Sequence, residues 1–232
     1  MAARVLHTRE HAAPLSGLLE ARGVVAVHVP LISRVATGLG PPSGAPATVL
    51  FTSPAAVGAP TRLREAISGA VSVAVGPATA AALRARGVTD VRVGDRGGGG
   101  AVELLRRVVG ERPGPVWHVR GRKTSRTVEE ALLDAALEPT PWFVYETRAV
   151  PGAGAALRAE APVDVICFAS VSAARAYVRA GGDQTVPCAV LGHDTARGAS
   201  TAGLEVRAVA ARPELWSLAD AALLALSAPS DG

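Results

Sequence analysis

The sequence has very few aromatic residues and almost no cysteine. Aromatic residues make up 3% of the 232 residues, whereas hydrophobic residues make up 49% and charged residues 19%. A core must therefore consist mainly of Ala, Val and Leu, and this composition argues against disorder. The 2 cysteines cannot build a disulfide framework, and Cys167 lies in an apolar segment where a buried, inert thiol in a reducing compartment is expected.

Long hydrophobic segments are also missing. No uninterrupted apolar run approaches the roughly 18 residues that a membrane-spanning helix needs. The first strand is expected to begin at Arg4, which leaves no room for a signal peptide. We therefore expect a cytoplasmic protein that makes no contact with a membrane.

Charge of one sign is not clustered anywhere in the chain. The formal net charge is +4, and the basic residues, nearly all arginine, are scattered along the sequence. Binding to nucleic acid is therefore not expected. A mild positive excess does suit a small polyanionic ligand.

The common metal and nucleotide motifs are absent as well. The 5 histidines are dispersed, and His7 and His11 lie on either side of a strand end and a helix start, so no metal site is expected. The segment "GRKTSR" (121–126) lacks the glycine spacing of a phosphate-binding loop, and no G-x-S-x-G motif occurs. The glycines at 97–100 are predicted to form a flexible loop. We expect no cofactor.

The sequence does contain a regular alternation of short apolar strands and helical segments. Helices are predicted over 10–23, 127–137 and 214–226, among others. Strands are predicted over 4–8, 24–30, 48–52, 71–75, 91–94, 115–119, 142–146, 163–169, 187–192 and 205–209. Near-continuous apolar strands that alternate with helices predict an α/β fold with parallel sheets covered on both faces.

An internal repeat organises these elements. The segment "TVLFTSPAAVGA" (48–59) resembles "DVICFASVSAARA" (164–176), and "GPAT" (76–79) resembles "GHDT" (192–195). Residues 4–30 similarly match 115–146. The chain therefore contains two copies of a similar strand-and-helix unit.

Two crossings rich in Gly and Pro, at 31–46 and 147–155, are predicted to link two domains. The first domain combines residues 1–34 with 150–232, and the second is inserted at 37–147. This organisation predicts two similar doubly wound domains, joined by a two-stranded linker, with a cleft between them.

The repeated junctions place small polar residues where strands end and helices begin. Gly76 and Thr79 are repeated as Gly192 and Thr195, and Ser53 has its counterpart in Ser170. Because the first helical amides lack partners within the helix, such junctions can bind anions. Ordinary helix capping is the alternative interpretation.

Larger side chains at strand ends are also candidates. Arg9 and Arg120 hold matching places in the repeat and could each bind a carboxylate, with Lys123 and Arg148 adding charge; solvated arginines are the alternative. Tyr145 ends the strand "WFVYE" and could exchange a hydrogen bond or a proton with a ligand. A half-buried structural tyrosine is the alternative there.

The ordered series of motifs resembles the uroporphyrinogen-III synthase family over nearly the whole chain. The motifs, in order, are "VLHTRE" (5–10), "VLFTSPAAV" (49–57), "VAVGPATAAALRARGV" (73–88), "VRGRK" (119–123), "VYET" (144–147), "ICFASVSAARAY" (166–177) and "VLGHDTARGASTAGLEV" (190–206). Three positions depart from the family pattern: Ala55, Ala169 and the acidic Asp194.

The resemblance implies a cofactor-independent lyase that cyclises hydroxymethylbilane, a linear tetrapyrrole polycarboxylate, with inversion of ring D and loss of water. It implies Tyr145 as the residue that helps the ring A hydroxyl to leave. We expect a monomer, because the duplication within the chain already supplies both walls of the cleft, and transient contact with the preceding pathway enzyme. The substrate-binding residues that the resemblance implies are Thr8, Arg9, Ser53, Gly76, Thr79, Arg120, Gly121, Ser170, Gly192 and Thr195.

The sequence is compatible with other functions. The main alternative is a catalytically degenerate, tetrapyrrole-binding regulatory module of the same fold, although no attached DNA-binding segment is recognisable. A two-lobed sugar- or amino-acid-binding protein is usually larger and exported. A non-specific nucleic-acid binder is suggested only by the basic pI of about 9.8.

Overall fold

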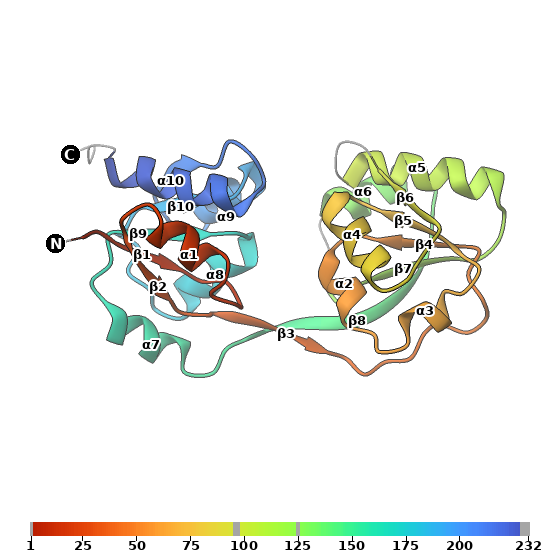
Figure 1. Ribbon diagram of the computed structural model, residues 1–232, viewed down its shortest axis with the longest axis horizontal. Helices are drawn as coiled ribbons and strands as arrows, with labels where there is room; N and C mark the ends of the chain where they lie inside the picture. Colours follow the sequence, from red (N-terminus) through yellow and green to blue (C-terminus); the bar gives the residue numbers. More distant parts are fainter. Residues whose placement is uncertain (1, 95–97, 124–125, 228–232) are drawn as a thin grey trace. The chain divides into compact units, whose positions relative to one another are not determined.

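The chain forms two compact units, each with its own sheet and cores. A computed structural model describes residues 2–94, 98–123 and 126–227 (Figure 1). By internal contacts, unit 1 comprises Met1–Ser33 with Arg148–Gly232, and unit 2 comprises Arg34–Thr147. The chain thus passes between the units at residues 33–34 and 147–148.

Unit 1 is built on a five-stranded sheet in the order β11-β10-β9-β1-β2, and the strand pairs are parallel. Its strands are β1 (Arg4–His7), β2 (Val25–His28), β9 (Val165–Phe168), β10 (Cys188–Val190) and β11 (Val206–Val209). Alternate residues of each strand enter two different cores, as the two-residue period of a strand requires. Val5 packs with α1 (Leu15–Glu20) and α10 (Leu215–Ser227), whereas Leu6 packs with α7 (Ala153–Glu160), α8 (Val171–Arg179) and α9 (His193–Thr201).

Unit 2 is built on a six-stranded sheet in the order β3-β8-β7-β4-β5-β6. The strands are β3 (Ile32–Ala36), β4 (Thr48–Phe51), β5 (Val71–Ala74), β6 (Val91–Val93), β7 (Val116–Gly121) and β8 (Thr140–Ala149). Phe51 faces α2 (Pro54–Gly58), α3 (Leu63–Ala66) and α4 (Pro77–Ala85). Leu50 faces α5 (Gly98–Glu111) and α6 (Arg126–Asp134) on the other side of the sheet. The α/β class with parallel sheets between helices is therefore confirmed.

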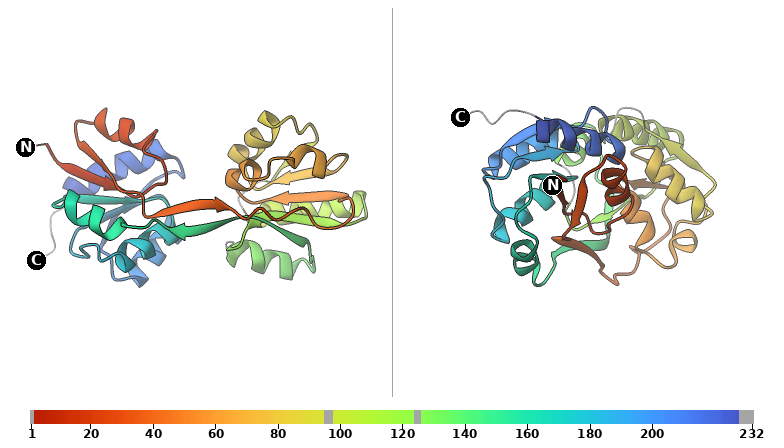
Figure 2. Two further views of the ribbon diagram at one scale, coloured as in Figure 1. Left: turned by 90° about the horizontal axis from the view of Figure 1, so that it is seen from below. Right: turned by 60° about the vertical axis from the view of Figure 1, so that its left-hand side comes forward.

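Two strands carry the chain across the limit between the units. β3 and β8 are neighbours in the sheet, and both extend past the residues at which the units divide (Figure 2). The crossing at 31–46 was predicted as part of a two-stranded linker, and its residues Ile32–Ala36 form β3. Thr37 continues the pairing, because its N–H donates to the Val144 carbonyl over 3.1 Å.

Two local expectations were wrong. The glycines at 98–100 are not a loop but the first turn of α5; Gly97 lies outside the described residues. Glycine costs little there because the first helical amides have no partner in the helix, while the buried Ala101 and Leu105 fix the helix on the sheet. The helix expected over 10–23 is confined to Leu15–Glu20 by Pro14 at its N-cap and by Gly23, whose φ is +79°.

Candidate functional site

In unit 2, the sequence-derived candidates lie on four adjacent strands, β8, β7, β4 and β5 (Figure 1). Those of β7, β4 and β5 are at the carboxyl ends, whereas β8 continues past Tyr145 to Ala149, so Tyr145 does not end its strand as the sequence suggested. Ser53 follows β4 in an extended conformation and caps α2, where its hydroxyl accepts a hydrogen bond from the Ala56 N–H over 3.3 Å. Gly76 follows β5 and caps α4, with Pro77 in the first helical position. Ligands of open parallel sheets bind beyond this edge, so the topology places these residues where a site is expected.

Tyr145 lies on β8 beside two of these junctions. Its phenol oxygen is 3.4 Å from the Ser53 Oγ, and Gly121 is its partner in the parallel pairing of β7 with β8. The side chain is half-buried and packs against the core that includes Val144. The structure therefore brings Tyr145, Ser53 and Gly121 together on one unit.

Arg120 is largely buried and contacts other side chains, so it is not the solvated arginine that the sequence also allowed. Its side chain is 17% exposed, and its guanidinium lies 5.0 Å from the centre of the Phe143 ring and 3.5 Å from the Glu129 carboxylate. Its Nε is buried and has no hydrogen-bond partner among the described residues. A carboxylate ligand would therefore compete with Glu129 for this guanidinium.

In unit 1, the equivalent candidates follow three adjacent strands, β1, β9 and β10. Thr8 comes directly after β1 and is 1% exposed, with an Oγ1 that is buried and unpartnered among the described residues; Arg9 follows it. Ser170 caps α8 and accepts from the Ala173 N–H over 3.3 Å, and Gly192 caps α9. The repeat thus reproduces the cap chemistry of unit 2.

An open pocket lies at the Gly192 junction of unit 1. It has a volume of about 320 Å³. Its lining residues are Ala169, Leu191, Gly192, His193, Asp194, Thr195 and Pro213. Two of the sequence-derived candidates, Gly192 and Thr195, therefore face the same hollow.

The two capping glycines are not required by the protein itself. Gly76 and Gly192 have φ values of −165° and −175°, which any residue can adopt. A Cβ atom added at either glycine would have no heavy atom within 4 Å outside its chain neighbours. Thr79 and Thr195, each in the third helical position, are both buried. Each helix start therefore has open space in front of it, as an approaching ligand would need.

Comparison with known proteins identifies the family. The family model described as uroporphyrinogen-III synthase HemD matches residues 13–220. The chain belongs to the uroporphyrinogen-III synthase family. No curated protein sequence matches the chain significantly.

Two solved uroporphyrinogen-III synthase structures share the fold over almost their full length. A mutant enzyme from the extreme thermophile Thermus thermophilus aligns with 97% of this chain and 99% of its own, at 18% identity and a TM-score of 0.63. The synthetase from Helicobacter pylori 26695 aligns with 96% and 99%, at 18% identity and a TM-score of 0.69. At this level of identity the likeness concerns the fold.

Of the three positions that the resemblance to the uroporphyrinogen-III synthase family marks as departures, Asp194 is the one that carries a charge. It lies in the first turn of α9, beside the pocket at Gly192. Arg197, one turn along the helix, forms an ion pair with it. This internal partner offsets the negative charge that Asp194 would otherwise present to an anionic ligand.

Buried histidines support the strand ends, although from the sequence they were assessed only as metal ligands. The His7 ring stacks on His28 at 4.8 Å between ring centroids, and the His28 Nε2 donates to the Arg9 carbonyl over 2.8 Å. Burial lowers the pKa of His7 to about 4, with the nearby His28 and Arg9 adding to the shift. His7 and His118 each precede a candidate arginine by two positions. This shared spacing in the two repeats is the sequence feature from which the two buried histidines could have been predicted.

His118 has the corresponding place in unit 2. Its ring is 3% exposed, and its Nε2 lies 3.4 Å from the Thr52 Oγ1. Burial lowers the pKa of His118 to about 3, and the Arg120 charge contributes. Both histidines are thus neutral supports at physiological pH.

The described residues hold no group of three or more potential metal ligands, and none of their helices is long and apolar enough to span a bilayer.

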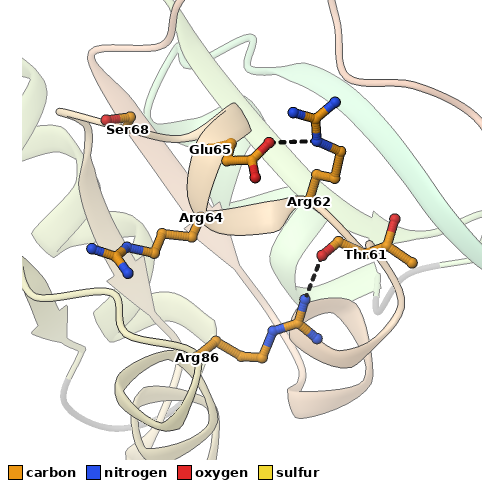
Figure 3. A pocket seen from close by; sticks show the side chains of 6 residues that line it. All are labelled: Thr61, Arg62, Arg64, Glu65, Ser68 and Arg86. Atoms are coloured by element: carbon orange, nitrogen blue, oxygen red, sulfur yellow. Dashed lines mark hydrogen bonds and ion pairs between the residues drawn. The ribbon is translucent and has the colours of Figure 1, made fainter.

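A second hollow, of about 370 Å³, lies at the opposite end of α4 from Gly76 (Figure 3). Its lining residues are Thr61, Arg62, Arg64, Glu65, Ser68 and Arg86. Arg62 forms an ion pair with Glu65, and Arg86 donates to the carbonyls of Pro60 and Thr61 over 2.6 and 3.2 Å. These arginines therefore hold the loop before α3, away from the carboxyl ends of the strands.

Proposed function

We propose that this chain is a uroporphyrinogen-III synthase, which cyclises hydroxymethylbilane with inversion of ring D and loss of water. The observation that carries the proposal is the family match over residues 13–220. The alternative, a catalytically degenerate regulatory module, is not favoured by that match. We further infer that the enzyme is a lyase, acts as a cytoplasmic monomer and makes transient contact with the preceding pathway enzyme.

The substrate carboxylates are proposed to bind at the strand ends of the sheets. Helix amides at the Gly76 and Gly192 junctions are neutral donors, and the open space in front of both glycines supports this role. Neutral donors suit a ligand that must rearrange, because they hold a carboxylate without a rigid salt bridge. The full proposed set is Thr8, Arg9, Ser53, Gly76, Thr79, Arg120, Gly121, Ser170, Gly192 and Thr195.

Tyr145 is proposed as the catalytic residue. Its phenol donates a hydrogen bond or its proton to the ring A hydroxyl, which leaves as water while the electron pair of the ring A nitrogen forms the azafulvene. The substituted carbon of ring D then attacks the methylene carbon of ring A, giving a spiro intermediate. The bond between this ring D carbon and the methylene carbon of ring C breaks, which leaves an azafulvene on ring C. The unsubstituted α-carbon of ring D attacks that azafulvene, so ring D recloses inverted, and the proton lost from the α-carbon returns to the phenol. The pyrrole nitrogens supply the electrons, so this route needs no enzyme nucleophile and no resident cofactor.

The remaining task of the protein is to control geometry. Unaided closure of the substrate gives the uninverted type I isomer, so a synthase must bring the substituted carbon of ring D to ring A before that closure occurs. The ratio of type III to type I product therefore measures how well the enzyme competes with the spontaneous reaction.

The test is a coupled assay from porphobilinogen with analysis of the product isomers. We expect type III product with the native chain and type I alone without it. The Tyr145→Phe variant should turn over roughly 100- to 10,000-fold more slowly, the range for proton-transfer assistance. Tyr177→Phe is the matched control, because Tyr177 belongs to the core of unit 1 and its hydroxyl donates to the Asp183 carbonyl.

Two results would contradict the proposal. Type I product alone from folded native protein would exclude synthase activity. Type III product formed at the native rate by Tyr145→Phe would remove this phenol from the mechanism while leaving the activity assignment intact.

A further inference from the structure

Gly121 leaves the space that the Tyr145 ring occupies. A Cβ atom at residue 121 would lie 2.6 Å from the Tyr145 Cε2, 2.7 Å from its Cζ and 3.1 Å from its hydroxyl oxygen. Ordinary contacts of a Cβ atom begin at about 3.4 Å, so any larger residue would displace the ring by about 0.8 Å. Glycine is therefore required at this position for room, because the ring lies directly against the backbone of β7.

A register shift in the sheet accounts for this contact. Arg120 pairs with Phe143, but the next residue of β7, Gly121, pairs with Tyr145, so Val144 is an extra residue on β8. Trp142 and Val144 pack in the same core, and regular alternation would turn the following side chain to the other face. With the bulge, Tyr145 packs against that core too. Bulges re-aim side chains in this way beside active sites.

Ser53 holds the other end of the phenol. Its Oγ lies 3.4 Å from the phenol oxygen and accepts a hydrogen bond from the Ala56 N–H. Because the amide hydrogen is directed at the serine oxygen, the serine hydroxyl hydrogen remains available for the phenol oxygen. The phenol can then donate its own hydrogen to a ligand.

We propose that Gly121 and Ser53 are positioning residues for Tyr145: the first sets the depth of the ring, and the second sets the place of its oxygen. This inference rests on the proposed role of Tyr145 in catalysis. A displacement of about 1 Å can cost roughly 100-fold in rate. Gly121→Ala should therefore lower kcat roughly 10- to 100-fold.

Fluorine NMR tests the positioning without reference to activity. The chain has 2 tyrosines, so protein labelled with 3-fluorotyrosine gives one resonance from Tyr145 and one from Tyr177, assigned with Tyr145→Phe. Gly121→Ala should move the Tyr145 resonance and leave that of Tyr177 unchanged. Gly110→Ala is the matched control, since a Cβ atom there meets nothing within 4 Å, and it should move neither resonance.

Ser53→Ala gives a second route that avoids crowding, should Gly121→Ala fail to fold. Ser170→Ala is its control for the spectrum, because both serines cap a helix over 3.3 Å but only Ser53 contacts a tyrosine. We expect the Tyr145 resonance to move in Ser53→Ala and to stay in place in Ser170→Ala.

Turnover in the isomer assay completes the test. If Gly121 acts through Tyr145, the double variant Gly121→Ala/Tyr145→Phe should be no slower than Tyr145→Phe alone. Additive losses would overturn the inference, as would an unmoved Tyr145 resonance in Gly121→Ala or Ser53→Ala. If the native chain makes no type III product, the proposed function fails, whereas the NMR spectra still decide whether these residues position the ring.

Discussion

Mild acid should weaken unit 2 through the buried imidazole of His118. Burial lowers the pKa of His118 to about 3 from its usual 6.5, and the Arg120 charge contributes. The imidazole of His118 is therefore protonated below about pH 6.5 in the unfolded chain, but it stays neutral in the folded chain until the pH approaches 3. Stability supplied by the neutral imidazole is complete above about pH 6.5 and is lost as the pH falls from there toward about 3.

The size of the effect follows from the two pKa values. At pH 5, which is 1.5 units below the usual pKa of 6.5, His118 is protonated in the unfolded chain but still neutral in the folded chain. This difference in protonation lowers the free energy of unfolding by about 2 kcal/mol. This result is insensitive to the folded value, because any pKa well below 5 gives the same difference. Unit 2 should therefore lose about 2 kcal/mol of its free energy of unfolding through His118 between pH 7 and pH 5.

The tryptophans allow unit 2 to be followed by itself. Of the 3 tryptophans in the chain, Trp117 and Trp142 lie in the core of unit 2 and Trp216 belongs to unit 1. In a Trp216→Phe background, fluorescence-detected urea unfolding at pH 7 and pH 5 reports unit 2. His118→Gln should reduce the fall in stability between the two pH values by about 2 kcal/mol.

A matched control comes from the repeat. His7 has a similarly lowered pKa, of about 4, but belongs to unit 1, so His7→Gln should leave the pH dependence of unit 2 unchanged. If the free energy of unfolding of unit 2 fell equally in the native and His118→Gln proteins between pH 7 and pH 5, the prediction would be refuted. His118 would then be protonated in the folded unit as readily as in the unfolded chain.

Two further predictions concern binding and packing. Thr79→Ala and Thr195→Ala should each weaken binding of the cyclised tetrapyrrole, measured by anaerobic titration; unchanged affinity in both would contradict carboxylate binding at these junctions. Gly198→Ala should lower the free energy of unfolding by about 1–3 kcal/mol, because its Cβ would lie 2.5 Å from the Val171 Cγ1. Adding Val171→Ala should restore part of the loss in urea unfolding, and no restoration would point to strain elsewhere.

The strands were predictable because their burial leaves a direct trace in the sequence. Val165–Phe168 and Thr48–Phe51 are buried throughout, so they appear as nearly continuous apolar runs. Ile32–Ala36 is only partly buried along its length and contains polar residues, so it resembled a linker. Helix lengths were harder to predict, since Pro14 and Gly23 decide the limits of α1 by conformation and not by hydrophobic period.

The residue types of the candidate site were predictable, but their mutual geometry was not. Ser53, Gly121 and Tyr145 were all selected from strand ends, yet nothing in their spacing indicates that they contact one another. That contact depends on the extra residue Val144, and a bulge leaves no periodic signal. The support of Arg9 by His28 likewise depends on a hydrogen bond to backbone.

The interpretation of the junctions as ordinary helix caps explains the serines better than the glycines. Ser53 and Ser170 have nearly the same backbone angles, φ of −158° and −161°, and each caps its helix in the same way, so duplication of a cap accounts for both. Gly76 and Gly192 make no side-chain cap, have conformations open to any residue and would accept a Cβ atom without contact. A serine would cap these helices at least as well, so neither folding nor packing selects glycine there. Glycine does allow the closest approach of a ligand oxygen to the helix amides, and this is the role that we assign to it.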